Sequence, residues 1–144
     1  MPPHALIHGV SIAGLLASIL IALIFISLCS LLEEPKRRDF MAIMIAGAGA
    51  AYLNGGLGKW EFVFTAFVTW LAYKGLHSYT LIGIGWMLHT GWDIVHHLYG
   101  HPIVPFVPTS SLGCAICDPV IAAWSFAGAP SVYQLLRPNR VPKG

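Results

Sequence analysis

The chain has 144 residues, of which 56% are hydrophobic and only 10% are charged. Soluble domains average just under half apolar and about a quarter charged, and one soluble core cannot hide so much apolar surface. The net charge of +2 is dispersed, so we expect no nucleic-acid partner. The composition therefore predicts an all-α polytopic transmembrane bundle, a single domain over residues 1–144 with the lipid bilayer around it.

The first apolar segment, residues 5–32, contains no Asp, Glu, Lys or Arg. It is longer than a helix needs to cross a hydrocarbon core of about 30 Å. No basic stretch precedes it, so we expect a retained helix rather than a cleaved signal. The charged turn EEPKRRD follows, and then the second segment, residues 40–53, which is rich in Ala and Gly. Small residues at this density favour close packing against another membrane helix.

Three more apolar segments follow: residues 60–76, 78–99 and 112–129. The turn NGGLGK precedes the first of them, and the loop GHPIVPFVPTSS, whose three prolines exclude regular helix, precedes the last. The sequence thus predicts about five spans in the inner (plasma) membrane.

The basic residues set the expected orientation of these spans. One set of alternate links holds all but one of them, and the other set holds only Lys59. Because short basic loops stay cytoplasmic, we expect the N-terminus outside and the C-terminus in the cytoplasm.

In this topology the polar residues gather near the outer ends of the spans, where every span contributes to one layer. Its members are His4, His8, Asn54, Glu61, Asp93, His96, His97, His101, Cys114, Cys117 and Asp118. The inner ends hold only the ordinary basic residues of the turns.

The stretch LHTGWDIVHHLYGHP carries the densest part of this layer. At 100° per residue, with His89 at zero, Asp93 falls at about 40°, His96 at about −20° and His97 at about 80°. The four residues share one helix face. Ionisable groups within a span are costly and normally point into the bundle, so this face indicates a functional site.

Imidazole and carboxylate groups at this spacing are ligands for Zn, Fe or Cu, and His89, Asp93, His96 and His97 are the predicted metal ligands. Glu61 and Asp118 are the candidate acid or base residues. Each has a structural alternative, because Glu61 can stabilise the start of its helix and Asp118, before Pro119, can cap one.

Five further residues are additional candidates at the site: His8, His101, Asn54, Cys114 and Cys117. The two cysteines form a C-x-x-C motif, whose alternative is simple apolar packing of free thiols. Each histidine has the alternative of a solvated or hydrogen-bonded side chain.

Two blocks, YLNGGLGKWEF and GWMLHTGWDIVHHLYGHPIVPFVPTSSLGCAICDPVIAAW, make the chain resemble an uncharacterised family of small bacterial polytopic membrane proteins. The resemblance covers about His8 to Trp124 and implies a membrane location without an activity. In ligand type alone, the array is also similar to the sites of membrane metal hydrolases related to alkaline ceramidases and of membrane oxygenases. The full motif of neither group is present.

The leading hypothesis is a metal site near the outer membrane face, catalytic on a small or lipid-soluble substrate. One alternative is a transporter of metal ions or protons, with the histidines as a relay. The other is a non-catalytic accessory subunit, in a homo-oligomer or a larger membrane complex, whose Ala and Gly faces dock on a partner.

Overall fold

The structure is a computed structural model that describes residues 11–137. Every regular element among these residues is a helix, so the all-α prediction is confirmed. The helices are α1 (Ile12–Cys29), α2 (Lys36–Ala50), α3 (Lys59–Gly75), α4 (Tyr79–Tyr99), α5 (Ser110–Phe126) and the short α6 (Val132–Leu135). Each of the five long helices lies on one of the predicted apolar segments.

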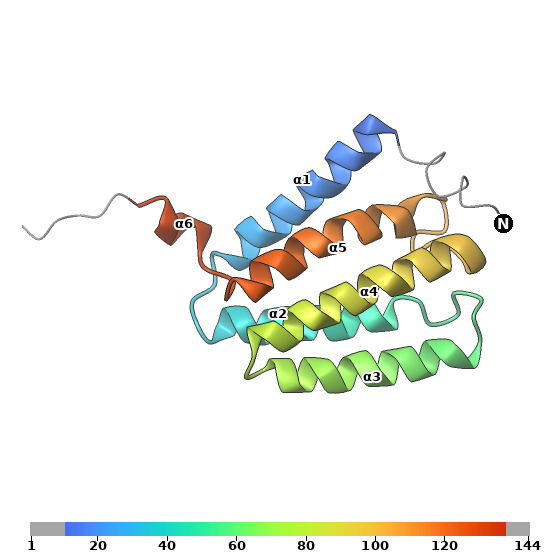
Figure 1. Cartoon of the computed structure of the whole chain (residues 1–144), viewed down its shortest axis with the longest axis horizontal. Helices are drawn as coiled ribbons and strands as arrows, with labels where there is room; N and C mark the ends of the chain where they lie inside the picture. Colours follow the sequence, from blue (N-terminus) through green and yellow to red (C-terminus); the bar gives the residue numbers. More distant parts are fainter. Residues whose placement is uncertain (1–10, 138–144) are drawn as a thin grey trace, which may run out of the picture.

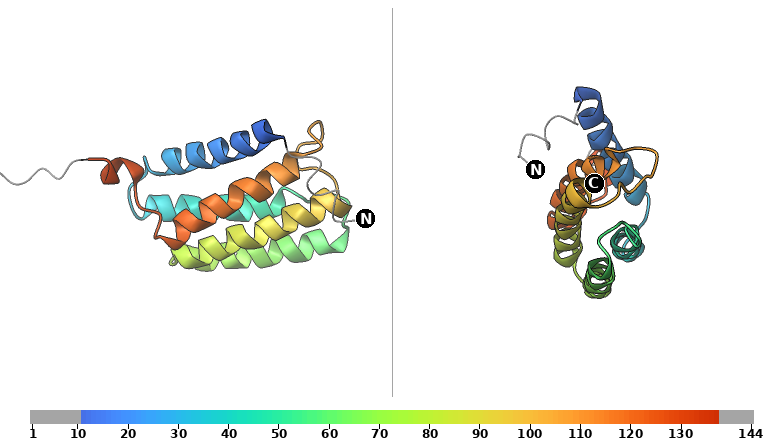
Figure 2. Two further views of the ribbon diagram at one scale, coloured as in Figure 1. Left: turned by 45° about the horizontal axis from the view of Figure 1, so that its top comes forward. Right: turned by 90° about the vertical axis from the view of Figure 1, so that its right-hand side faces the viewer.

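Consecutive long helices run antiparallel (Figure 1), so the N-terminal ends of α1, α3 and α5 lie beside the C-terminal ends of α2 and α4. We call this end of the bundle the loop end, and the opposite end the arginine end. α4 packs along α5, α2 packs along α3, and α1 packs mainly on α5. α1 and α3 therefore lie at opposite edges of the bundle (Figure 2), and each leaves a broad outer face uncovered.

Those outer faces are strongly apolar. Four large side chains of α3, Phe62, Val63, Phe67 and Trp70, are each about half exposed or more. The exposed apolar side chains of α1 are more numerous: Ile12, Leu15, Leu16, Leu20, Ile21, Leu23, Ile24 and Leu28.

Within residues 11–137, α1 is the one helix that is both long and apolar enough to cross a membrane, and α5 is apolar but shorter. At 1.5 Å per residue, α1 is about 27 Å long. The five-span topology thus stays a prediction.

Several helix boundaries differ from the predicted segments, and α1 (Ile12–Cys29) is shorter at both ends than the predicted 5–32. α2 begins at Lys36, because the basic residues of the EEPKRRD turn form its first turn instead of a solvated link. α5 begins at Ser110 and ends at Phe126. Its end comes early because Gly128 and Ala129 adopt positive φ angles of 82° and 46°, which break the helical path.

The arginine end is held by two arginines of α2. The buried Arg37 donates to the carbonyl oxygen of Ala129 at 2.9 Å and twice to that of Leu32 at 2.7 and 3.0 Å. Arg38 donates to the carbonyl oxygen of Leu76 at 2.8 Å. Because helices end with unpaired carbonyl groups, these bonds tie the ends of α1, α3 and α5 to the start of α2.

Candidate metal centre

Two neighbouring helices bring three ionisable side chains together. The buried face of α4 carries two of them, His89 and Asp93, and the facing side of α5 carries the third, Asp118. His96 lies on the same buried face of α4. His89 and Asp118 are the middle residues of their helices. The cluster of His89, Asp93 and Asp118, which we call the triad, thus lies deeper in the bundle than the layer at the helix ends that the sequence predicts.

The geometry of the triad is that of a compact ligand set. His89 Nδ1 lies 2.7 Å from Asp118 Oδ2 and 3.2 Å from Asp93 Oδ2. One ligand atom from each residue lies within 4.8 Å of the other two, and all three side chains are buried. Three oxygen and nitrogen donors of this kind suit a divalent transition metal.

The contact made by the second ring nitrogen of His89, Nε2, determines which ring nitrogen carries a hydrogen. Nε2 lies 2.9 Å from the carbonyl oxygen of Ala48 in α2, which can only accept a hydrogen bond. Nε2 therefore carries a hydrogen, and Nδ1 faces the carboxylates. Two lone pairs cannot remain 2.7 Å apart without a positive centre between them, so a proton or a metal ion must bridge Nδ1 and Asp118.

Tyr52, just beyond α2, completes this arrangement. Its hydroxyl donates to Asp93 Oδ1 at 2.6 Å, which leaves Oδ2 free to face His89. The tyrosine is 2% exposed, so water does not compete for this bond. Outer partners of this type orient the ligands of metal sites and affect their affinity strongly.

His96, a predicted ligand, lies outside the triad in an aromatic surrounding. Its ring stacks on Tyr52 with 3.9 Å between centroids, and neither ring nitrogen has a hydrogen-bond partner among the described residues. A Cβ atom at Gly55 would lie 2.4 Å from His96 Cε1, and one at Gly100 would lie 2.5 Å from His96 Nδ1. A side chain at either position would overlap the ring of His96, so the position of His96 requires glycine at both.

Glu61 is buried at the start of α3, but it serves the NGGLGK turn. Its two carboxylate oxygens accept from the backbone N–H groups of Leu57 at 2.7 Å and Asn54 at 2.8 Å. Glu61 thus orders the turn before α3 rather than capping the amides of α3 itself, and its carboxylate is not part of the triad.

The remaining predicted site residues are spread over the loop end. His97 is half-buried, and the side chains of His101 and Asn54 are exposed. Cys114 and Cys117 are free thiols on α5, so the described structure contains no disulfide in the C-x-x-C motif. His8 lies outside the described residues.

The interpretation of Asp118 as a helix cap is wrong. α5 begins at Ser110, so Asp118 and Pro119 lie in its interior. A proline inside a helix has no N–H group for the carbonyl four residues earlier, here that of Ala115. The cap interpretation assumed that Pro119 starts a helix, but α4 and α5 pack closely enough to keep it within one.

Residues 13–131 match a family described as "Family of unknown function (DUF6010)". The chain belongs to this family. The comparisons with curated proteins and with solved structures found no match. The resemblance predicted from the two sequence blocks is confirmed at the level of an uncharacterised family.

In this DUF6010 chain, sequence reasoning missed Tyr52 and the carbonyl of Ala48. Tyr52 belongs to the YLNGGLGKWEF block, and a buried carboxylate such as Asp93 requires a donor, so a tyrosine at the same predicted depth was an available signal. The carbonyl of Ala48 left no signal, because every residue has one.

Proposed function

We propose that this chain is a multi-pass protein of the inner membrane in which the triad holds a divalent transition metal, Zn, Fe or Cu, and acts on a small or lipid-soluble substrate. The observation that carries the proposal is the buried meeting of His89, Asp93 and Asp118, with ligand atoms within 4.8 Å of one another. An unpaired carboxylate in such surroundings is costly, so two of them beside one imidazole call for a cation.

The donor set and its outer partners fit a catalytic metal. Catalytic zinc sites have three protein ligands and leave a position for water or substrate, and the triad supplies three. The carbonyl of Ala48 fixes the hydrogen on His89 Nε2, and Tyr52 orients Asp93. A bound metal of this kind activates water or polarises a substrate oxygen.

The membrane part of the proposal is supported by the surface of the bundle. Soluble monomers seldom expose contiguous apolar patches of more than a few hundred Å², yet α1 and α3 both present long rows of exposed aliphatic and aromatic side chains. The basic residues of the long helices are divided unevenly, with Lys36, Arg37, Arg38 and Lys74 at the arginine end and Lys59 at the loop end, as positive-inside orientation requires.

Transport through the bundle is less well supported. Between the triad and the arginine end, the interior is filled by apolar side chains such as Met41, Ile45, Ile82 and Ile121. A relay of protons or metal ions needs polar groups along its whole path. An accessory role in a larger complex stays open as a proposal, although Gly49 of the Ala- and Gly-rich α2 packs against Val68 within this chain.

Elemental analysis of protein purified without chelators tests the metal. We expect a stoichiometric transition metal in the wild type, its loss in Asp118→Asn and Asp93→Ala, and its retention in the control His97→Ala, which changes a half-buried histidine outside the triad. His96→Ala also keeps the metal if the triad alone binds it. Wild-type protein that contains no metal, and takes none up from added Zn²⁺ or Fe²⁺, would contradict the proposal.

A further inference from the structure

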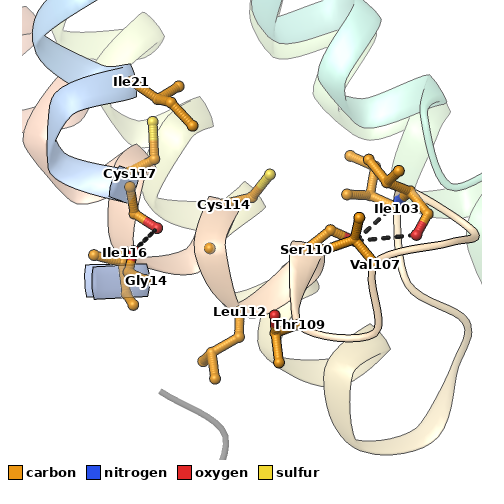
Figure 3. A pocket seen from close by; sticks show the side chains of 13 residues that line it. Gly14, Ile21, Ile103, Val107, Thr109, Ser110, Leu112, Cys114, Ile116 and Cys117 are labelled. Atoms are coloured by element: carbon orange, nitrogen blue, oxygen red, sulfur yellow. Dashed lines mark hydrogen bonds between the residues drawn. The ribbon is translucent and has the colours of Figure 1, made fainter. Parts of the chain in front are cut away.

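A cavity of about 320 Å³ lies between α1, α5 and the loop that precedes α5. Figure 3 shows Ile21 of α1 and Cys117 of α5 at one side, Ile103 and Val107 of the loop at the other, and Cys114 between them. None of the lining side chains is charged. We call this space the α1–α5 cleft.

The two serine hydroxyl groups that line the cleft are already bonded within the chain, and the third lining hydroxyl, that of Thr109, belongs to an exposed residue at the start of α5. Ser18 donates to the carbonyl oxygen of Gly14 at 3.0 Å, and Ser110 accepts from the backbone N–H of Val104 at 2.9 Å. A ligand therefore gains little by hydrogen bonding to these serines. Its affinity must come from apolar contact, which favours a hydrocarbon over a polar molecule.

The opening of the cleft adjoins the apolar outer face of α1. Leu20 and Ile24 are about half exposed beside Ile21, so a molecule entering from this side passes over hydrocarbon-like surface. The volume is at the lower end of the roughly 300–1,000 Å³ typical of ligand pockets, which suits one chain better than a two-chain lipid.

One residue that lines the cleft, Cys114, is close along α5 to a residue of the triad, although the triad itself does not line the cleft. Cys114 lies one helical turn before Asp118 on α5, and residues four apart share a helix face. A chain that fills the cleft with its polar end at Cys114 thus places that end about one helical turn from Asp118.

From these contacts we propose that the α1–α5 cleft binds a single hydrocarbon chain, such as that of a fatty acid or fatty alcohol, with its polar end near Cys114. The inference rests on the proposed function for the chemistry at that polar end. Binding of the chain itself depends only on the apolar walls and does not require a metal.

Photolabelling tests the cleft directly. The full chain in phosphatidylcholine vesicles is irradiated with palmitic acid that carries a diazirine near its methyl end, and the labelled peptides are identified by mass spectrometry. Because the polar end is placed near Cys114, we expect this methyl-end probe to label the apolar walls, the loop around Ile103 to Val107 or α1 around Ile21, rather than Cys114. Excess unlabelled palmitic acid should compete for this labelling. Labelling of the outer face of α3 reports ordinary lipid contact and should not be competed.

Two matched pairs of variants keep the test specific. Ile21→Trp and Val107→Trp fill the cleft, whereas Leu20→Trp and Phe106→Trp add the same side chain at exposed neighbours that do not line it. A loss of about 1.4 kcal/mol in binding free energy lowers labelling of the cleft about tenfold. We expect that loss in the first pair and little change in the second, with the metal content unchanged in all four.

Labelling that is not competed, or that is equal in cleft-filling and control variants, would overturn the proposal. So would a fall in oligomeric mass in Ile21→Trp without a change in labelling, since a second copy would then occupy the cleft. Metal content is measured on the same samples, so an absence of metal with competed labelling rejects the proposed function and leaves the cleft assignment standing.

Discussion

At the residue scale, the triad depends on two hydrogen bonds from outside it, one at His89 Nε2 and one at Asp93 Oδ1. The carbonyl oxygen of Ala48 accepts the hydrogen of His89 Nε2, and the hydroxyl of Tyr52 donates its hydrogen to Asp93 Oδ1. What remains is Nδ1 of the histidine, Oδ2 of Asp93 and the carboxylate of Asp118, whose Oδ2 lies 2.7 Å from Nδ1. The arrangement is that of a buried ligand set whose outer partners fix the orientation of His89 and Asp93.

Tyr52→Phe isolates the contribution of one outer partner. We expect metal affinity to fall about 10- to 100-fold, because Asp93 loses the donor that directs its second oxygen toward His89. The variant also loses a buried hydrogen bond to a carboxylate, which is worth about 1.5–3 kcal/mol of stability. Competition with a chelator measures the first effect and thermal unfolding in detergent the second.

The control for this substitution is Tyr99→Phe, because Tyr99 is 72% exposed at the end of α4. Equal metal affinity and equal unfolding temperature in the two variants would mean that the bond between Tyr52 and Asp93 does not support the site.

At the scale of the elements, the two ends of the bundle are built differently. At the loop end, Glu61 accepts backbone N–H groups of the NGGLGK turn, so an acid organises a loop. At the arginine end, Arg37 donates to backbone carbonyls that follow α1 and α5. Both devices satisfy backbone groups of the segments between helices, N–H groups at the loop end and carbonyl groups at the arginine end.

Arg37→Ala removes three hydrogen bonds from the arginine end. Because each hydrogen bond to a charged group contributes about 1.5–3 kcal/mol, we expect an unfolding temperature several degrees below that of the wild type. Arg37→Lys should recover only part of the loss, since a lysine lacks the planar fork that reaches two carbonyls at once.

Lys36→Ala serves as the matched control, because Lys36 is the exposed neighbour of Arg37 in the first turn of α2. An Arg37→Ala protein as stable as Lys36→Ala would show that the carbonyl contacts do not hold the helix ends together.

At the scale of the whole molecule, the antiparallel helices (Figure 1) place Tyr52, Asp93 and His96 in the half of the bundle toward the loop end, with His89 and Asp118 at its inner border in the middle of α4 and α5. In the proposed topology this half faces outward and the arginine end faces the cytoplasm. The uncovered faces of α1 and α3 then contact lipid, and the α1–α5 cleft opens sideways into the bilayer.

Reporter fusions test this orientation. Green fluorescent protein at the C-terminus should be fluorescent, and alkaline phosphatase there should be inactive, because the basic links favour the cytoplasm. A phosphatase fused after Gly58, in the turn before α3, should be active because that turn faces outward. An active phosphatase at the C-terminus would contradict the orientation and the outward placement of the triad.

The sequence determined the features of this protein that follow from local order along the chain. Runs of apolar residues predict the five long helices within a few positions, and the period of α4 predicts that His89, Asp93 and His96 share its buried face. His97, at the edge of that sector, is only half-buried. Prolines and glycines placed the loops for the same local reason.

Only the tertiary structure decided which side chains meet. Asp118 rather than Glu61 joins His89 and Asp93, because α4 packs along α5 at the level of their middle residues. The donor from Tyr52 and the aromatic surrounding of His96 depend equally on where α2 ends beside α4. Contacts between helices join residues far apart in the chain, and their register is set by side-chain packing over the whole bundle, which no local pattern encodes.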